Sequence, residues 1–197
     1  MTFISAFYNF SIELNHADRG IFTSFRTKVP RHELESSEHF FASILAYCHA
    51  YTPELKFSNA SSPDVPSMWA HDPVGNVLTW IQVGVPKKRL LELSLKQNPD
   101  TQHLVYFYRE EDIAKFCHYL RGSTSNWIKQ VTFYQLSLGV LEQLGAIEDT
   151  SPRWNISFID NTIYLTINSL DIESELTPIN MWDAFQKSLL SSHGAEQ

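Results

Sequence analysis

Alternating apolar and polar residues at both ends of the chain predict two long β-hairpins. In residues 3–14 one face is apolar at a period of two, formed by Ile4, Ala6, Tyr8, Phe10, Ile12 and Leu14. Turn-forming residues 15–20 follow, and a second alternating run from Ile21 to Val29 is expected to end at Pro30. A third and a fourth run, residues 154–158 and 163–167, flank Asp160-Asn161.

Between the hairpins, apolar residues recur at helical spacing or in short dense runs. The pattern predicts helices near 33–51, 87–97, 110–120 and 138–147, strands at 77–83, 102–108 and 131–136, and one helical turn at 67–70. The fold class is therefore α+β (or α/β), with a mixed sheet flanked by helices in a single domain. We expect this domain to cover residues 1–170. Residues 171–197 would form a C-terminal extension that is partly docked and frayed from Ser191 onward.

Composition narrows the class of protein. The chain has 197 residues, 43% of them hydrophobic, which suits one domain with a sizeable core. Two cysteines form neither a disulfide framework nor a zinc pattern, and no signal peptide or membrane span is recognised, so we expect a cytoplasmic protein. The net charge of -7 argues against general coating of nucleic acid but leaves room for a local basic site.

One buried strand carries an unexpected polar side chain. Gln82 lies within Trp80-Ile81-Gln82-Val83-Gly84, which follows a turn at Asp72-Pro73-Val74-Gly75-Asn76. Upstream, Glu35 and Glu38 lie near the core-facing side of a predicted helix start. Carboxylates in such a place must be solvated, paired or bound to a cation.

These residues occur in an order that resembles the YaeQ family of bacterial cytosolic proteins. The likeness covers roughly residues 3–168. It is carried by Asp18-Arg19, by His32 with Glu35 and Glu38, by Leu45-Ala46-Tyr47, Leu55-Lys56-Phe57 and Trp69, and by the Asp72–Asn76 turn, Trp80–Pro86 and Asp160-Asn161. The resemblance implies a restriction-endonuclease-like fold with a PD-(D/E)xK core. It also implies a candidate nuclease, although the activity of the family is not well defined.

Carried over by resemblance, the family's helix glutamate falls on Glu35, with Glu38 close by, and the aspartate after the tryptophan falls on Asp72. The strand glutamate of the family falls on Gln82, and a second acidic position falls on Ser67. The usual nuclease lysine, already missing from the family pattern, would fall on Gly84. Glu35, Asp72 and Gln82 are thus the implied catalytic residues, and Glu35, Glu38 and Asp72 the implied ligands for Mg²⁺ or Mn²⁺.

Two functions remain open from the sequence. The chain is either a metal-dependent nuclease with a degenerate, weak or inactive site, or a non-catalytic module on the same fold that binds nucleic acid or protein. Lys87, Lys88 and Arg89 are possible phosphate contacts, or simply a solvated face. We expect no membrane partner, and a monomer or a weak dimer formed through an edge strand.

Two weaker patterns could also carry metal chemistry. His32, Glu35 and His39 have helical spacings of three and four, which can present metal ligands on one face. Pro63-Asp64 has the form of a nuclease "PD" pair, but two residues are a weak signal.

Overall fold

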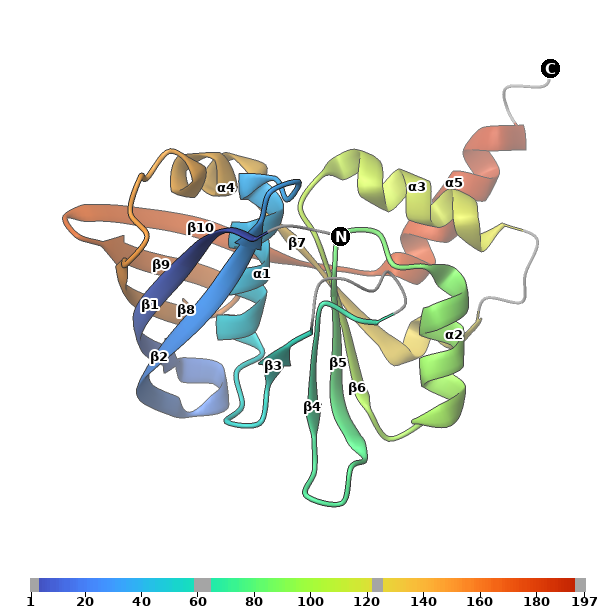
Figure 1. The fold of residues 1–197 in the computed structure, drawn as a ribbon. Helices are drawn as coiled ribbons and strands as arrows, with labels where there is room; N and C mark the ends of the chain where they lie inside the picture. Colours follow the sequence, from blue (N-terminus) through green and yellow to red (C-terminus); the bar gives the residue numbers. More distant parts are fainter. Residues whose placement is uncertain (1–3, 59–64, 122–125, 194–197) are drawn as a thin grey trace. The chain divides into compact units, whose positions relative to one another are not determined.

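The computed structural model describes residues 4–58, 65–121 and 126–193, and their contacts group into two compact units. Unit 1 takes its described residues from 1–51 and 136–177. Unit 2 takes them from 52–58, 63–135 and 178–197. Each unit contains both strands and helices (Figure 1), so the mixed α+β class is confirmed.

In unit 1 the strand order is β2-β1-β8-β9-β10. The strands are β1 (Ile4–His16), β2 (Ile21–His32), β8 (Arg153–Ile159), β9 (Thr162–Ile167) and β10 (Leu170–Ile179). β1 pairs antiparallel with β2 and parallel with β8, whereas β8, β9 and β10 are antiparallel neighbours. The 3-10 turn η1 (Ala17–Arg19) joins β1 to β2, and the helices are α1 (Ser37–His49) and α4 (Leu138–Gly145).

Aromatic side chains form the core of unit 1. The inward face of β1 buries Tyr8, Phe10, Ile12 and Leu14, as the alternation predicted. Phe10 contacts the ring of Trp154 edge-on at 5.1 Å between centroids, and Tyr8 lies 4.7 Å from Phe40 of α1. Helix α1 is buried from Phe40 through Cys48, because apolar residues cover most of its circumference.

Both predicted hairpins are confirmed, with two differences near β2. β2 continues through Pro30 to His32, because β2 is the edge of its sheet and the missing N–H of proline costs no ladder hydrogen bond there. Helix α1 begins at Ser37 rather than near Glu33, because the Ser36 hydroxyl accepts a hydrogen bond from the His39 N–H at 3.2 Å and caps the helix. Glu35 therefore lies before the helix.

In unit 2 the strand order is β7-β6-β5-β4-β3. The strands are β3 (Lys56–Phe57), β4 (Met68–His71), β5 (Val77–Val83), β6 (Gln102–Phe107) and β7 (Val131–Leu136). β5, β6 and β7 are parallel, whereas β3, β4 and β5 are antiparallel, so this sheet is mixed. The helices are α2 (Lys88–Gln97), α3 (Glu110–Leu120) and α5 (Met181–His193), with the 3-10 helix η2 (Asn126–Gln130) before β7.

The core of unit 2 lies between one face of this sheet and its helices. Its largest buried members are Trp80, Phe107, Phe116, Phe133 and Phe185. Trp80 and Gln82 are two residues apart on β5, so Gln82 faces the same side of the sheet as this cluster.

Three predicted boundaries differ from the structure. Residues 68–71 form strand β4 rather than part of a helical turn, because they pair with β5. The predicted boundary at residue 170 falls at the start of β10, which pairs with β9 from Leu170 to Glu175. The frayed end was predicted for 191–197, but α5 continues to His193 and residues 194–197 lie outside the described residues. No helix in the described part of the chain is long and apolar enough to cross a membrane.

Two imidazole rings lie close together, tilted by 37°, at one end of the β1 and α1 packing in unit 1. His16 of β1 lies 5.1 Å from His49 of α1, and both rings contact Phe158. Burial, with smaller contributions from the neighbouring His16 and Arg19, lowers the pKa of His49 to about 3. Burial also lowers the pKa of His16, with Arg19 adding to the effect and Asp18 opposing it. The Arg19 guanidinium donates to the carbonyls of His49 (2.8 Å) and Tyr51 (3.1 Å), which holds η1 against the end of α1.

This histidine pair makes the stability of the protein depend on pH. The folded state keeps His49 neutral, whereas the unfolded chain takes up a proton below its ordinary pKa of 6.5. The stabilisation is complete above 6.5 and is lost progressively as the pH falls toward about 3. We expect His49 alone to lower the free energy of unfolding by up to about 1.4 kcal/mol per pH unit in that window. Urea unfolding of His49→Phe, which keeps a ring but binds no proton, should show a shallower pH dependence than the wild type. An equal slope would contradict the assignment.

A second buried polar network fastens α2 to β6. The Ser94 hydroxyl lies 2.9 Å from Nε2 of His103, and Nδ1 of His103 lies 2.9 Å from the Thr101 carbonyl. Since a carbonyl can only accept, Nδ1 carries the proton and Nε2 accepts from Ser94. Both side chains are buried, so the network joins the two elements.

Removing the Ser94 hydroxyl should leave Nε2 of His103 buried without a partner. We expect Ser94→Ala to lower the free energy of unfolding by about 1–3 kcal/mol, the cost of an unsatisfied buried group. The measurement is urea unfolding at neutral pH. Ser43→Ala is the matched control, because its hydroxyl donates to the His39 carbonyl at 2.9 Å and satisfies no imidazole. If Ser94→Ala is equally destabilising in a His103→Phe background, the proposed coupling is absent.

Candidate functional site

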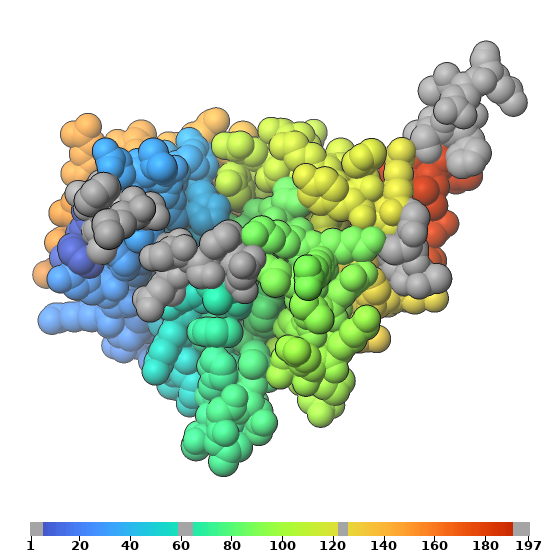
Figure 2. Space-filling view, turned by 45° about the vertical axis from the view of Figure 1, so that its right-hand side comes forward, coloured from blue at the N-terminus to red at the C-terminus, as the bar shows by residue number. Residues whose placement is uncertain are grey.

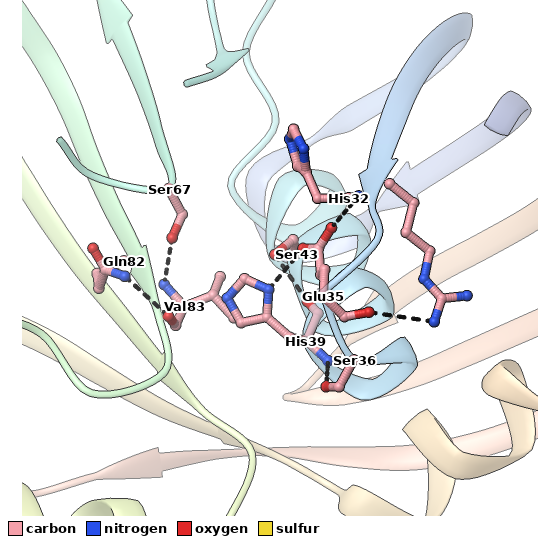
Figure 3. A network of polar contacts seen from close by, with 9 residues as sticks. His32, Glu35, Ser36, His39, Ser43, Ser67, Gln82 and Val83 are labelled. Carbon is pink, nitrogen blue, oxygen red and sulfur yellow. Dashed lines mark hydrogen bonds and ion pairs between the residues drawn. The ribbon is translucent and has the colours of Figure 1, made fainter. Parts of the chain in front are cut away.

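The pairing of β4 with β5 brings together the two positions where this chain departs from the family pattern. Met68 pairs with Ile81 and Trp69 with Trp80, so the antiparallel register places Ser67 opposite Gln82. The Ser67 hydroxyl accepts a hydrogen bond from the Val83 N–H at 3.0 Å, and Nε2 of Gln82 donates to the Val83 carbonyl at 3.0 Å (Figure 3). Both side chains are half-buried, and neither carries a charge.

The residue after this pair takes a conformation suited to glycine. Gly84 has a φ of 78°, and its N–H donates to the Tyr106 carbonyl at 2.8 Å. A side chain there would have room, since a Cβ would meet only Cε1 of Tyr108 at 3.9 Å. The backbone is the constraint, because a left-handed conformation costs a residue with a Cβ roughly 1–2 kcal/mol. The position of the usual nuclease lysine is therefore built for glycine.

Asp72 organises the turn between β4 and β5. Its Oδ1 accepts from the N–H groups of Val74 (2.9 Å) and Asn76 (2.8 Å), and its Oδ2 accepts from the side-chain amide of Asn76 (2.7 Å). The hydrogen bond from the Asn76 amide is the main cause of the lowered pKa of Asp72, and the N–H groups of the turn add to it. The turn projects from the sheet of unit 2 (green in Figures 1 and 2). These contacts are those of an Asx turn.

Asp72 and Gln82 lie at opposite ends of β5. His71, next to Asp72, pairs with Val77, and Gln82 follows Val77 by a further five residues of the strand. At about 3.3 Å per residue this separates the two positions by roughly 17 Å, too far to share a metal ion. The structure therefore does not bring Asp72 and Gln82, two of the implied catalytic residues, together.

Glu35 and Glu38 belong to unit 1, whereas Ser67, Asp72 and Gln82 belong to unit 2. Glu35 is held by its own neighbours: Oε1 lies 2.8 Å from Nδ1 of His39, and Oε2 accepts from the His32 N–H at 3.4 Å (Figure 3). Glu38 accepts from the Ser37 hydroxyl at 3.4 Å. The Glu35 carboxylate is 18% exposed, so it is paired rather than fully solvated.

The alternative metal set of His32, Glu35 and His39 is only partly assembled. His39 and Glu35 form an ion pair, but His32 reaches Glu35 through its main-chain N–H and not through its ring. In the described ranges of the chain, no group of three or more His, Cys, Asp or Glu side chains is placed to hold a metal ion. The Pro63-Asp64 pair lies outside the described residues.

Three basic residues lie near the Ser67 and Gln82 pair along the chain. β5 ends at Val83 and α2 begins at Lys88, so Lys87, Lys88 and Arg89 follow the same end of the strand. The first turn of α2 holds no acidic residue. The Lys87 carbonyl accepts from the N–H groups of Leu90 (3.0 Å) and Leu91 (3.2 Å) and starts the helix.

Sequence reasoning gave too little weight to Ser67. From the sequence it is a departure from the family pattern and not one of the predicted site residues, and residues 67–70 are predicted separately as one helical turn. A strand assignment would have placed Ser67 beside Gln82, since two short strands joined by an Asp-x-x-Gly-Asn turn form a hairpin.

Comparison with known proteins gives one consistent family. The family model described as "YaeQ protein" matches residues 1–176. The chain is similar to a YaeQ protein of Salmonella typhi, with 23% identity over 90% of this chain and 97% of that protein. A YaeQ protein of Escherichia coli K12 is 22% identical over the same shares of the two chains. Both are named as uncharacterized proteins.

Solved structures agree in fold. The crystal structure of YaeQ from Pseudomonas syringae has a TM-score of 0.76 and 24% identity, covering 89% of this chain and 96% of that one. The structure of YaeQ from Xanthomonas axonopodis pv. citri has a TM-score of 0.77 and 17% identity, covering 87% and 96%. With a family model that spans nearly all of the paired strands described above, the chain belongs to the YaeQ family.

Proposed function

We propose that this chain carries a PD-(D/E)xK-type nuclease core in unit 2 whose metal site has degenerated, leaving it weak or inactive as a phosphodiesterase. The observation that carries the proposal is the neutral pair of Ser67, directly before β4, and Gln82 of β5, which the β4–β5 register places opposite each other. In the pattern that the chain resembles, both positions are acidic. The mixed order of β3 to β7 also suits such a core.

The chemistry of metal-dependent phosphodiester cleavage explains why the pair matters. Mg²⁺ and Mn²⁺ favour charged oxygen ligands, and carboxylates must both hold the ion and offset its charge. A hydroxyl and an amide supply oxygen atoms but no negative charge. Here the Ser67 hydroxyl accepts from the Val83 N–H, and the Gln82 amide donates to the carbonyl of the same residue. This donor set in unit 2 does not fit a tightly bound divalent cation.

The remaining predicted acids do not compensate within unit 2. Both oxygens of Asp72 accept hydrogen bonds inside its own turn, about 17 Å from Gln82 by the strand rise. Glu35 is engaged with His39 in unit 1. A lysine to orient an attacking water is also missing at Gly84, where the backbone takes a positive φ.

One observation favours a binding role over residual catalysis. Lys87, Lys88 and Arg89 begin α2 with no acidic residue in its first turn, just after the strand that ends beside the neutral pair. A basic helix start attracts phosphate, since its free N–H groups and the helix dipole act in the same direction. The second candidate function is therefore a non-catalytic module that contacts the backbone of nucleic acid through these residues.

Restoring the two carboxylates should restore cation binding. We expect Ser67→Asp with Gln82→Glu to gain a Mn²⁺-dependent rise in unfolding temperature, because two converging charges in a half-buried site favour the cation. At a Mn²⁺ concentration of about 100 times Kd the gain is about 2.7 kcal/mol. The wild type should show no comparable rise. Cleavage of single- and double-stranded DNA and RNA, measured in parallel, should appear in the double variant only.

Ser67→Asn with Gln82→Asn is the matched control, because it alters both side chains without adding charge. A Mn²⁺-dependent stabilisation of the wild type equal to that of the restored variant would contradict a degenerate site.

Asp72 provides a separate test of the revised assignment. We expect Asp72→Asn to lower the unfolding temperature by loosening the β4–β5 turn and to leave the Mn²⁺ response of the restored variant unchanged. The measurement is the same thermal titration, made in the Ser67→Asp, Gln82→Glu background. Loss of the Mn²⁺ response on replacing Asp72 would place this residue in the metal site after all.

A further inference from the structure

The outward face of the unit 1 sheet contains a hollow that the nuclease-type proposal does not use. Its volume is about 920 Å³, and it is lined by residues of β1, β2, β8 and β9 and by Asn168. This volume is within the range of about 300–1,000 Å³ that holds small-molecule ligands. The face is exposed and polar along its middle strands, opposite the aromatic core of the unit.

Two arginines flank a serine at one end of the hollow. Ser11 of β1 pairs with Arg26 of β2 on one side and with Arg153 of β8 on the other. Neighbouring strands are about 4.8 Å apart, so the two arginine Cα atoms lie about 10 Å from each other on the same face. Neither guanidinium makes an ion pair with any residue that the structure describes. Two unpaired guanidinium groups beside a hydroxyl are donors suited to a phosphate group.

The next row of the sheet has a different chemistry. Glu13 pairs with Ser24 on one side and with Asn155 on the other, and Asn155 pairs with Thr166 of β9. This row offers one carboxylate, two hydroxyls and an amide, all of which line the hollow. A carboxylate accepts hydrogen bonds from hydroxyl groups but repels a second phosphate. The hollow is therefore cationic at one end and suited to hydroxyl groups at the other.

We propose that this hollow binds a small ligand with a single phosphate group and neighbouring sugar-like hydroxyls. Arg26, Arg153 and Ser11 hold the phosphate, and Glu13 with Asn155 holds the hydroxyls. The site lies wholly in unit 1 and is independent of the proposal for Ser67 and Gln82.

The charge of the neighbouring strand favours a small ligand over a polynucleotide. Beyond Thr166 the exposed face continues onto β10 with Asp171, Glu173 and Glu175. Asp171 accepts a hydrogen bond from the Thr166 hydroxyl at 2.6 Å, at the border of the hollow. A phosphate chain that crossed the sheet would meet these carboxylates, whereas a single phosphate beside Ser11 would not.

Isothermal titration with ribose 5-phosphate, glucose 6-phosphate, ribose and inorganic phosphate tests this proposal on the full chain. We expect at least one sugar phosphate to bind at least about tenfold more tightly than inorganic phosphate, because the Glu13 row adds hydrogen bonds that the ion alone cannot make. Ribose should bind more weakly than ribose 5-phosphate, since it lacks the phosphate group.

Two variants assign the ends of the hollow. Arg26→Gln with Arg153→Gln should weaken the sugar phosphate by about tenfold or more, since charge-assisted hydrogen bonds are lost. Glu13→Gln should bring the sugar phosphate closer to inorganic phosphate in affinity. Lys28→Gln is the control for charge, because Lys28 is exposed on the same strand face as Arg26 but lies 4.2 Å from the Phe7 ring and outside the hollow. It should leave affinity within about twofold, and circular dichroism verifies the fold of each variant.

Absence of sugar phosphate binding at millimolar concentration overturns the proposal, as does an equal affinity for inorganic phosphate. An arginine double variant that binds as tightly as the wild type also overturns it. Tighter binding of a single-stranded oligonucleotide than of either sugar phosphate, abolished by the same arginine changes, replaces the proposed ligand with a polynucleotide.

Discussion

The antiparallel register between β4 and β5 determines which polar side chains lie near each other in unit 2. With Met68 opposite Ile81, the register places Ser67 opposite Gln82, and both side chains bond to the main chain of Val83. The same register sends Asp72 to the far end of the hairpin, where both of its oxygens are used by the turn. A slip by one residue would move every side chain of β4 to the other face and expose Met68 and Ala70, which are fully buried. The apolar residues thus fix the polar geometry.

The two units use polar groups in different ways. In unit 1 the histidine pair and the Arg19 contacts join β1, η1 and the end of α1, so burial of imidazole is linked to the seating of one helix. In unit 2 the Ser94–His103 network has the same role for α2, but both ring nitrogens of His103 have partners. His16 differs, because neither of its ring nitrogens has a hydrogen-bond partner in the structure. The His16 ring is therefore buried without hydrogen bonds, which favours its neutral form, whereas the His103 ring is held by two direct hydrogen bonds.

Where periodicity was long, sequence predicted the elements well. β1 and β2 each extend over a dozen residues or so, and helices α2 and α3 begin and end within a residue or two of their predicted limits. β4 was missed because four residues are too short for alternation to be distinguished from a helical turn. β10 was missed because Ser174 lies between the inward Ile172 and Leu176 and breaks the apolar pattern. The candidate site was predicted only in part for the same reason. Gln82 was identified from the pattern of one strand, whereas the position of Ser67 opposite it depends on the pairing of β4 with β5. Asp72 was predicted beside Gln82, although its Asp-x-x-Gly-Asn context already indicated the turn in which it lies.

Gly84 limits which substitutions this part of the protein can accept. Two of the three positions at which it differs from the usual nuclease pattern can change by ordinary side-chain replacement, because Gln82 lies within β5 and Ser67 directly precedes β4. The third cannot, because the backbone at residue 84 takes a positive φ and its N–H is bonded to Tyr106. A lysine there would first need the strand end to be rebuilt. An acidic residue at position 67 or 82 therefore needs only a side-chain replacement, whereas a lysine at position 84 also needs a change of backbone conformation. On the proposed nuclease-type core, a base would have to come from elsewhere in the chain, and the start of α2 supplies the nearest lysines to Gly84 along the sequence.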